Sequence, residues 1–157
     1  KLDGRNAERN GGVQYLYGQL SEVPGIVPPT IPAYIEAVHY LPFVTYKPEQ
    51  LGGLPVDLFV EALKAEGAAI EGGTKLRHRG GLHTQPMFTE RLHWAFEHPA
   101  NAESMGSVRY GPGTLPVTDN PPADRITLPQ LPRPAEALLD QYVEAFRKVA
   151  VNADALV

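Results

Sequence analysis

The chain has 157 residues, a net charge of −4 and no cysteine. Its negative charge argues against nucleic-acid binding, which needs a basic surface. The absence of cysteine excludes disulfides and thiolate metal sites, and it suits the cytoplasmic location that we expect. No apolar run approaches the roughly 18 residues that cross a membrane. The length is enough for one domain with a hydrophobic core, so we expect a single domain over residues 1–157.

Proline and glycine are unusually frequent. The 16 prolines and 15 glycines make about a fifth of the chain, whereas average usage is roughly 12 %. They gather between segments with regular hydrophobic patterns. We therefore expect long loops that join a few compact elements.

The first half of the chain predicts a helix, a strand and a second helix. Residues 2–21 predict a helix whose apolar stripe contains Leu2, Val13, Leu16 and Leu20. Residues 38–46 are β-branched and aromatic and predict a strand, in which Pro42 favours an edge position or a bulge. Residues 54–67 predict the clearest helix, with an apolar face of Leu58, Phe59, Ala62 and Leu63.

The second half is less regular until its end. Residues 68–71 predict a short strand, 89–99 a short helix and 126–131 another strand. Residues 134–150 keep helical spacing throughout and predict a terminal helix. The predicted fold class is therefore α+β, with a small antiparallel or mixed sheet covered by helices.

No complete catalytic group is visible in the sequence. There is no GxSxG elbow and no phosphate-binding glycine motif, and the glycine pairs are isolated. None of the five lysines lies in a context that would make it nucleophilic. His78 and His83 are five residues apart, as are His93 and His98, but zinc needs three or four converging ligands. We therefore expect no catalytic residue and no metal site.

Residues 77–88, RHRGGLHTQPMF, are the best candidate for a binding site. Arg77, His78, Arg79 and His83 supply donors that suit a phosphate, a carboxylate or sugar hydroxyls. The paired glycines would let the backbone approach a ligand closely. The alternative is a solvated basic loop, which composition alone favours.

The whole pattern resembles the C-terminal small domain of the DegT/DnrJ/EryC1/StrS sugar aminotransferases, which are fold-type I enzymes dependent on pyridoxal phosphate. The matching segments, in chain order, are KLDGRNAERN, VPGI, VHYLPFVTY, DLFVEALKAEGAAI, LHTQPMF, LPVTD and ITLPQL, followed by the final helix. The most specific of them is LHTQPMF with the helix before it. The preceding KLRHRGG departs from the family, which usually has a Tyr- or His-Pro step before the Leu-His pair.

The resemblance implies that the catalytic groups lie outside this chain. In the family, the Schiff-base lysine and most ligands of the cofactor belong to a large N-terminal domain. Pyridoxal phosphate is therefore expected in the full-length enzyme, and none is expected on this chain alone. By itself the chain should not transfer an amino group.

The resemblance also implies which residues meet the substrate, a keto-sugar or keto-cyclitol. His83 is the first choice, as a hydrogen-bond partner of a substrate hydroxyl or phosphate. His78 and Arg79 come second. His39 and Tyr40 match a conspicuous family position on the strand. An interpretation at least as favoured as substrate contact is that His39 is a polar residue at the border of the core and Tyr40 an aromatic core residue.

The implied partners are the chain's own large domain and a second subunit, because family enzymes are generally homodimers. The sequence begins in a helical pattern without an initiator Met, so we expect a piece of a longer protein. Such a piece should expose a large apolar patch and tend to self-associate. The alternatives are a stand-alone, non-catalytic polyol- or phosphate-binding module and, less favoured, a metal-binding protein built on the histidines.

Overall fold

A computed structural model describes residues 1–73, 81–92, 98–101, 108–119, 124–131, 133 and 135–157. The chain packs as two compact units. Unit 1 comprises Lys1–Leu76 and Ala123–Val157, and unit 2 comprises Arg77–Pro122. The expectation of one domain over the whole chain stays a prediction, and each unit is described by itself below.

Unit 1 is built on a four-stranded antiparallel sheet with the strand order β1-β2-β4-β3. The strands are β1 (Ile26–Val27), β2 (Phe43–Tyr46), β3 (Glu71–Gly72) and β4 (Arg125–Thr127). In the register of the two inner strands, Val44 lies opposite Ile126. Together with the helices, this sheet confirms the predicted α+β class.

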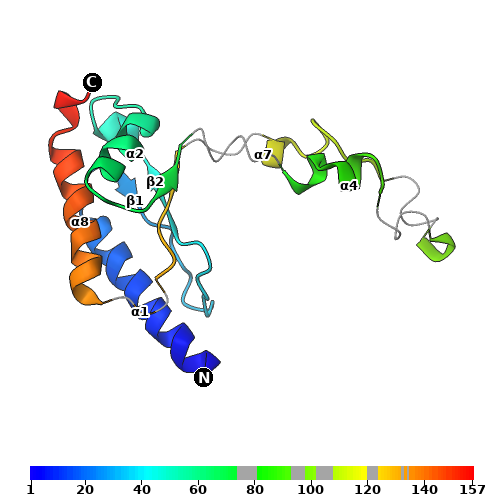
Figure 1. Cartoon of the computed structure of the whole chain (residues 1–157), viewed down its shortest axis with the longest axis horizontal. Coiled ribbons are helices and arrows are strands. Elements are labelled where there is room, and N and C mark those ends of the chain that lie inside the picture. The colour runs from blue at the N-terminus through cyan, green and yellow to red at the C-terminus, as the bar shows by residue number, and fades with distance from the viewer. Residues whose placement is uncertain (74–80, 93–97, 102–107, 120–123, 132, 134) are drawn as a thin grey trace. The chain divides into compact units, whose positions relative to one another are not determined.

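Three longer helices pack with the sheet in unit 1 (Figure 1). They are α1 (Leu2–Leu20), α2 (Val56–Ala65) and α8 (Glu136–Val151). α1 and α8 lie side by side and run in the same direction, since Tyr15 donates a hydrogen bond to Asp140 and Arg147 donates one to Gln19 further along both helices. The first turns of α1 and the residues that lead into α8 therefore share one end of the unit.

The core of unit 1 lies between the helices and one face of the sheet. Successive side chains of a strand point to opposite faces of the sheet, so Val44 and Tyr46 of β2 both point to the core face, where they are fully buried. The Tyr46 ring packs 4.8 Å from that of Phe59, which in turn lies 6.0 Å from Phe146 on α8. The Tyr46 hydroxyl donates a hydrogen bond of 2.8 Å to the Leu54 carbonyl, so its polar end is satisfied inside the core.

Two details of unit 1 differ from the sequence predictions. Strand β2 begins at Phe43, directly after Pro42, and it is an inner strand between β1 and β4. The predicted edge position was wrong because the proline precedes the ladder and does not interrupt it. Leu2 and Leu58 were placed on apolar faces, but both side chains are exposed.

Unit 2 contains short turns and short helices in its described part. They are η2 (Leu82–Thr84), α4 (Pro86–Thr89), η3 (Pro99–Asn101) and α7 (Pro116–Asp119). The predicted helix at 89–99 includes residues 93–97, which lie outside the described residues. Within the described parts of both units, no helix combines the length and apolar character needed to cross a membrane.

Candidate functional site

The segment GLHTQP at 81–86 forms two consecutive tight turns in unit 2. The Thr84 amide donates to the Gly81 carbonyl at 3.0 Å, and the Thr84 hydroxyl donates to the same oxygen at 2.7 Å. A proline then begins α4, where its missing N–H costs no helical hydrogen bond. These local bonds orient the His83 side chain.

His83 forms a buried pair with Asp119. Its Nε2 lies 2.7 Å from Asp119 Oδ1, across 36 positions of sequence. His83 is only 4 % exposed, and among the described residues it is the one with a polar or charged side chain that is buried. Asp119 is the last residue of α7, so the pair ties the 82–84 turn to the 116–119 turn.

Asp119 is held by three hydrogen bonds. Besides the bond to His83, its Oδ2 accepts from the Gly113 amide at 2.9 Å and from the Leu115 amide at 3.3 Å. Burial alone would raise the pKa of Asp119, but the hydrogen bonds from His83, Gly113 and Leu115 together lower it below its ordinary value. The carboxylate is therefore ionised near neutral pH and can only accept hydrogen bonds.

An ionised Asp119 determines the proton position on His83. Nε2 must carry a hydrogen toward the carboxylate, so Nδ1 is the ring nitrogen left for another partner. Nδ1 is buried and has no hydrogen-bond partner within the described residues. A buried polar atom without a partner is costly, which marks Nδ1 as the unusual atom of this site.

Gly81 covers that face of the imidazole. A Cβ built at position 81 would lie 2.4 Å from His83 Nδ1 and 2.3 Å from Cε1. Real Cβ atoms do not approach so closely, so the ring fits only because residue 81 lacks a side chain. The backbone of Gly81 is extended, with φ of −77°. Glycine is therefore required at position 81 because a side chain would not fit, and not because the backbone has an unusual φ. The sequence analysis expected the paired glycines to let the backbone approach a ligand. At Gly81, the backbone instead approaches the His83 ring closely.

This geometry limits what His83 can do. Nε2 is engaged by Asp119, and Nδ1 is covered. The imidazole can accept a hydrogen bond from a substrate hydroxyl only when the covering atoms move away from Nδ1. In the conformation described here, the pair joins two turns of unit 2.

Of the three predicted substrate-binding residues, the structure places only His83. His78 and Arg79 lie outside the described residues. Asp119 was not predicted as a site residue. It belongs to the LPVTD segment of the family resemblance, but nothing in the sequence pairs it with a histidine 36 positions away.

His39 lies in unit 1, at the border between core and surface. Its ring meets that of Tyr17 edge-on at 5.8 Å between centroids, and burial lowers the pKa of His39. It is one of the residues around a cavity of about 460 Å³ between α1 and the 29–39 loop. The neighbouring Tyr40 is 72 % exposed. The interpretation of His39 as a polar residue at the border of the core fits its contact with Tyr17. The interpretation of Tyr40 as an aromatic core residue was wrong, because its side chain is exposed.

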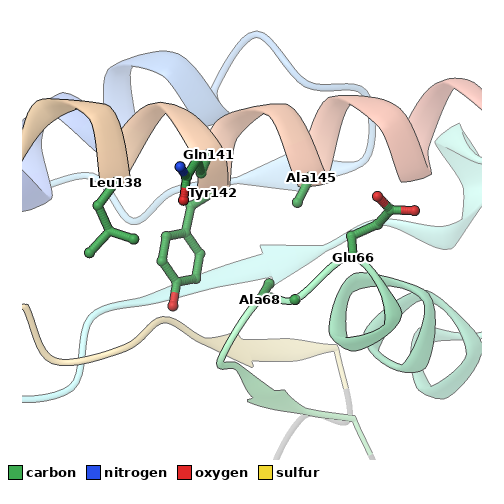
Figure 2. Close-up of a pocket in the computed structure, with 7 residues that line it drawn as sticks. Glu66, Ala68, Leu138, Gln141, Tyr142 and Ala145 are labelled. Atoms are coloured by element: carbon green, nitrogen blue, oxygen red, sulfur yellow. The ribbon is translucent and has the colours of Figure 1, made fainter.

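A smaller cavity, of about 80 Å³, lies between α8 and the end of α2 (Figure 2). Leu138, Gln141, Tyr142 and Ala145 reach it from α8, opposite Glu66 and Ala68. The Ala69 amide donates to the Tyr142 hydroxyl at 3.3 Å, and Glu66 forms an ion pair with Lys148 at 2.6 Å. These polar groups already have protein partners, and the volume is below the 300 Å³ or more of typical ligand sites.

The described residues do not fit a pyridoxal phosphate site. Such a site needs a lysine amine in desolvated surroundings. Lys64 and Lys148 form ion pairs with Glu61 and Glu66 on the surface, and no lysine lines the cavities beside His39 and Tyr142. The residues that the structure describes also bring together no group of three or more His, Asp or Glu side chains able to hold a metal ion.

No protein-family model matches the chain. A protein of Streptoalloteichus tenebrarius, named "Putative L-glutamine:3-amino-2,3-dideoxy-scyllo-inosose aminotransferase", is 31 % identical to it over 160 aligned positions. The alignment covers 98 % of this chain and 37 % of that protein. The chain is therefore similar, over nearly its whole length, to a little more than a third of an aminotransferase.

Proposed function

We propose that the chain is the C-terminal small domain of a pyridoxal-phosphate-dependent aminotransferase of the DegT/DnrJ/EryC1/StrS type. The observation that carries the proposal is the 31 % identity to an aminotransferase over 98 % of this chain. The relative's name states an amino-cyclitol ketone as its substrate and L-glutamine as its donor. A keto-cyclitol or related keto-sugar is accordingly the proposed amino acceptor here.

The surface of unit 1 supports a domain that packs against more protein. Between Ile31 and Leu41, large apolar side chains are repeatedly exposed: Ile31, Tyr34, Ile35, Val38, Tyr40 and Leu41. Tyr34 is 87 % exposed. Soluble monomers rarely leave many such side chains together in water. In the proposed enzyme, this 31–41 segment packs against the large domain of the same polypeptide or against a second subunit of a homodimer.

The proposed contribution of unit 2 is substrate recognition by the segment 77–88. His83 is the proposed ligand of a substrate hydroxyl, through Nδ1, after the Gly81 backbone moves off the ring. His78 and Arg79 are the proposed ligands of a phosphate or of further hydroxyls. By the family resemblance, the chemistry of amino transfer is assigned to a large domain outside this chain.

The test is amino transfer by the full-length protein that contains this sequence. Purified protein with added pyridoxal phosphate is incubated with isotopically labelled L-glutamine and a keto-cyclitol such as scyllo-inosose, and the aminated product is followed by mass spectrometry. The proposal predicts labelled amino-cyclitol. Full-length protein that binds no pyridoxal phosphate and transfers no label to any keto-cyclitol or keto-sugar would contradict it.

The His83 assignment has its own test in the same protein. His83→Ala is expected to raise KM for the acceptor while leaving the loading of pyridoxal phosphate unchanged. A matched control is His98→Ala, which removes an exposed histidine of unit 2 and should leave KM unchanged. An unchanged KM in His83→Ala, in a variant that still folds by circular dichroism, would remove His83 from the substrate site.

A further inference from the structure

Three arginines surround a cavity of about 390 Å³ at one end of unit 1. The cavity is lined by Arg5, Arg9, Leu131 and Arg133. Arg5 and Arg9 belong to the first turns of α1, and Arg133 lies just before α8. The two segments are more than 120 residues apart in sequence and meet because α1 and α8 run in the same direction from this end (Figure 1).

The cluster is electrostatically unfavourable as it stands. Arg5 and Arg9 are four residues apart on one helix, which places like charges side by side. Arg5 is also in the first turn of α1, at the positive end of the helix dipole, where cations are disfavoured. Arg133 adds a third guanidinium, although the chain as a whole carries a net charge of −4.

Acidic neighbours compensate only part of this charge. Glu8 pairs with Arg133 Nε at 3.3 Å, and Asp3 lies in the first turn of α1. Arg9 Nη1 reaches the His39 carbonyl at 3.4 Å, while Arg9 Nε is buried and has no hydrogen-bond partner within the described residues. Arg5 has no ion pair with any residue that the structure describes. The cavity therefore has an excess of donors over acceptors.

We propose that this cavity binds the phosphate group of a small molecule. Guanidinium groups present planar pairs of N–H donors that match phosphate oxygens, and three of them from two segments can surround a tetrahedral anion. The volume leaves room for the organic part of a phosphate monoester, for which Leu131 supplies an apolar wall. The site is separate from the His83–Asp119 pair and does not depend on the proposed aminotransferase function.

The test is a titration of this 157-residue chain with inorganic phosphate at constant ionic strength, followed by amide chemical shifts in NMR spectra. Constant ionic strength separates a specific site from general screening. The expected result is saturable binding, with the largest shifts at the amides of residues 5–9, Leu131 and Arg133. No saturation, or shifts centred elsewhere, would overturn the proposal.

Variants make the assignment specific. Arg9→Gln and Arg5→Gln are each expected to weaken phosphate binding about tenfold, as the loss of a charged hydrogen-bond donor does. Arg9→Lys keeps the charge but loses the planar fork, so it should fall between Arg9→Gln and the unchanged chain. The matched control is Arg147→Gln on α8, whose guanidinium bonds Gln19 instead.

Equal weakening by Arg147→Gln would show a general charge effect and overturn the site. A parallel titration with acetate tests the phosphate assignment itself. Acetate is expected to bind about tenfold more weakly or worse, because it has one oxygen pair for three guanidinium groups. Acetate affinity equal to that of phosphate would overturn the assignment to phosphate.

Discussion

Replacing Gly81 with alanine tests the account of the His83 environment. The new Cβ would lie 2.3 Å from His83 Cε1 and 2.4 Å from Nδ1, whereas carbon atoms in good contact are about 3.5–4.0 Å apart. The ring would have to retreat by more than about 1 Å. It is held on its other side by Asp119 at 2.7 Å, which leaves no room for a direct retreat. The ring would have to turn aside, and turning aside breaks that hydrogen bond.

The magnitude follows from two opposing terms. Overpacking in a filled site costs about 1–3 kcal/mol. Alanine in place of glycine at a compatible φ gains about 0.4–1 kcal/mol, because the unfolded chain loses conformational freedom. We therefore expect Gly81→Ala to lower the free energy of unfolding of unit 2. In a His83→Ala background the ring is gone and only the Thr118 methyl, 2.9 Å from the new Cβ, remains in the way, so the same change should cost clearly less.

The assay is a double-mutant cycle measured by urea unfolding. Fluorescence follows Trp94, the single tryptophan of the chain, which belongs to unit 2 by sequence. Gly18→Ala on α1 is the control, since nothing lies within 4 Å of its added Cβ and helix propensity predicts a gain of about 1 kcal/mol. Because α1 belongs to unit 1, this gain is followed by circular dichroism. An equal cost of Gly81→Ala in both backgrounds would refute the argument that the imidazole requires the glycine.

Two further predictions concern pH. Burial raises the pKa of Tyr46 from 10.0 to about 12. The contribution of the neutral hydroxyl to the free energy of unfolding is therefore present below pH 10 and is lost as the pH rises toward 12. Tyr46→Phe should make the free energy of unfolding fall less steeply with pH in this range. Hydrogen bonds lower the pKa of Asp119 below its ordinary value of 3.8, so its contribution is present above that pH and is lost as the pH falls below it. Asp119→Asn should make the unfolding of unit 2 less dependent on pH in acid.

Each pH prediction has an outcome that would contradict it. If Tyr46→Phe left the alkaline decline unchanged, the other tyrosines would account for it, and the buried Tyr46 hydroxyl would not titrate differently in the folded state. If Asp119→Asn left the acid dependence unchanged, the hydrogen bonds to His83, Gly113 and Leu115 would not favour the ionised carboxylate.

Hydrophobic periodicity predicted α1, α2 and α8 well, because the pattern that marks the buried face of a helix is contained within one continuous segment. Residues 2–21 and 134–150 became α1 and α8, and the apolar face around Phe59 and Leu63 became the buried side of α2. Short strands are less predictable. β1 has only two residues, too few to show an alternation of apolar and polar side chains in the sequence. It is a strand because its backbone pairs with β2.

In the candidate sites too, features within one segment were predictable and contacts between segments were not. The sequence singled out His83 because of its unusual neighbours. The burial of His83 and its pairing with Asp119 depend on the fold, and the sequence pattern did not predict them. Asp119 and the convergence of Arg5, Arg9 and Arg133 depend on contacts between distant segments. Local patterns carry no information about such contacts when a single sequence is considered.

The most direct measurement of the central claim is the intact mass of the native gene product, taken together with its visible absorbance from bound pyridoxal phosphate. The account predicts a polypeptide far heavier than the 17.1 kDa of this chain, with the cofactor bound. A native product of 17.1 kDa without the cofactor absorbance would contradict it. The chain would then be a free-standing module, and its arginine cavity and His83 segment would have to be explained as binding sites in their own right.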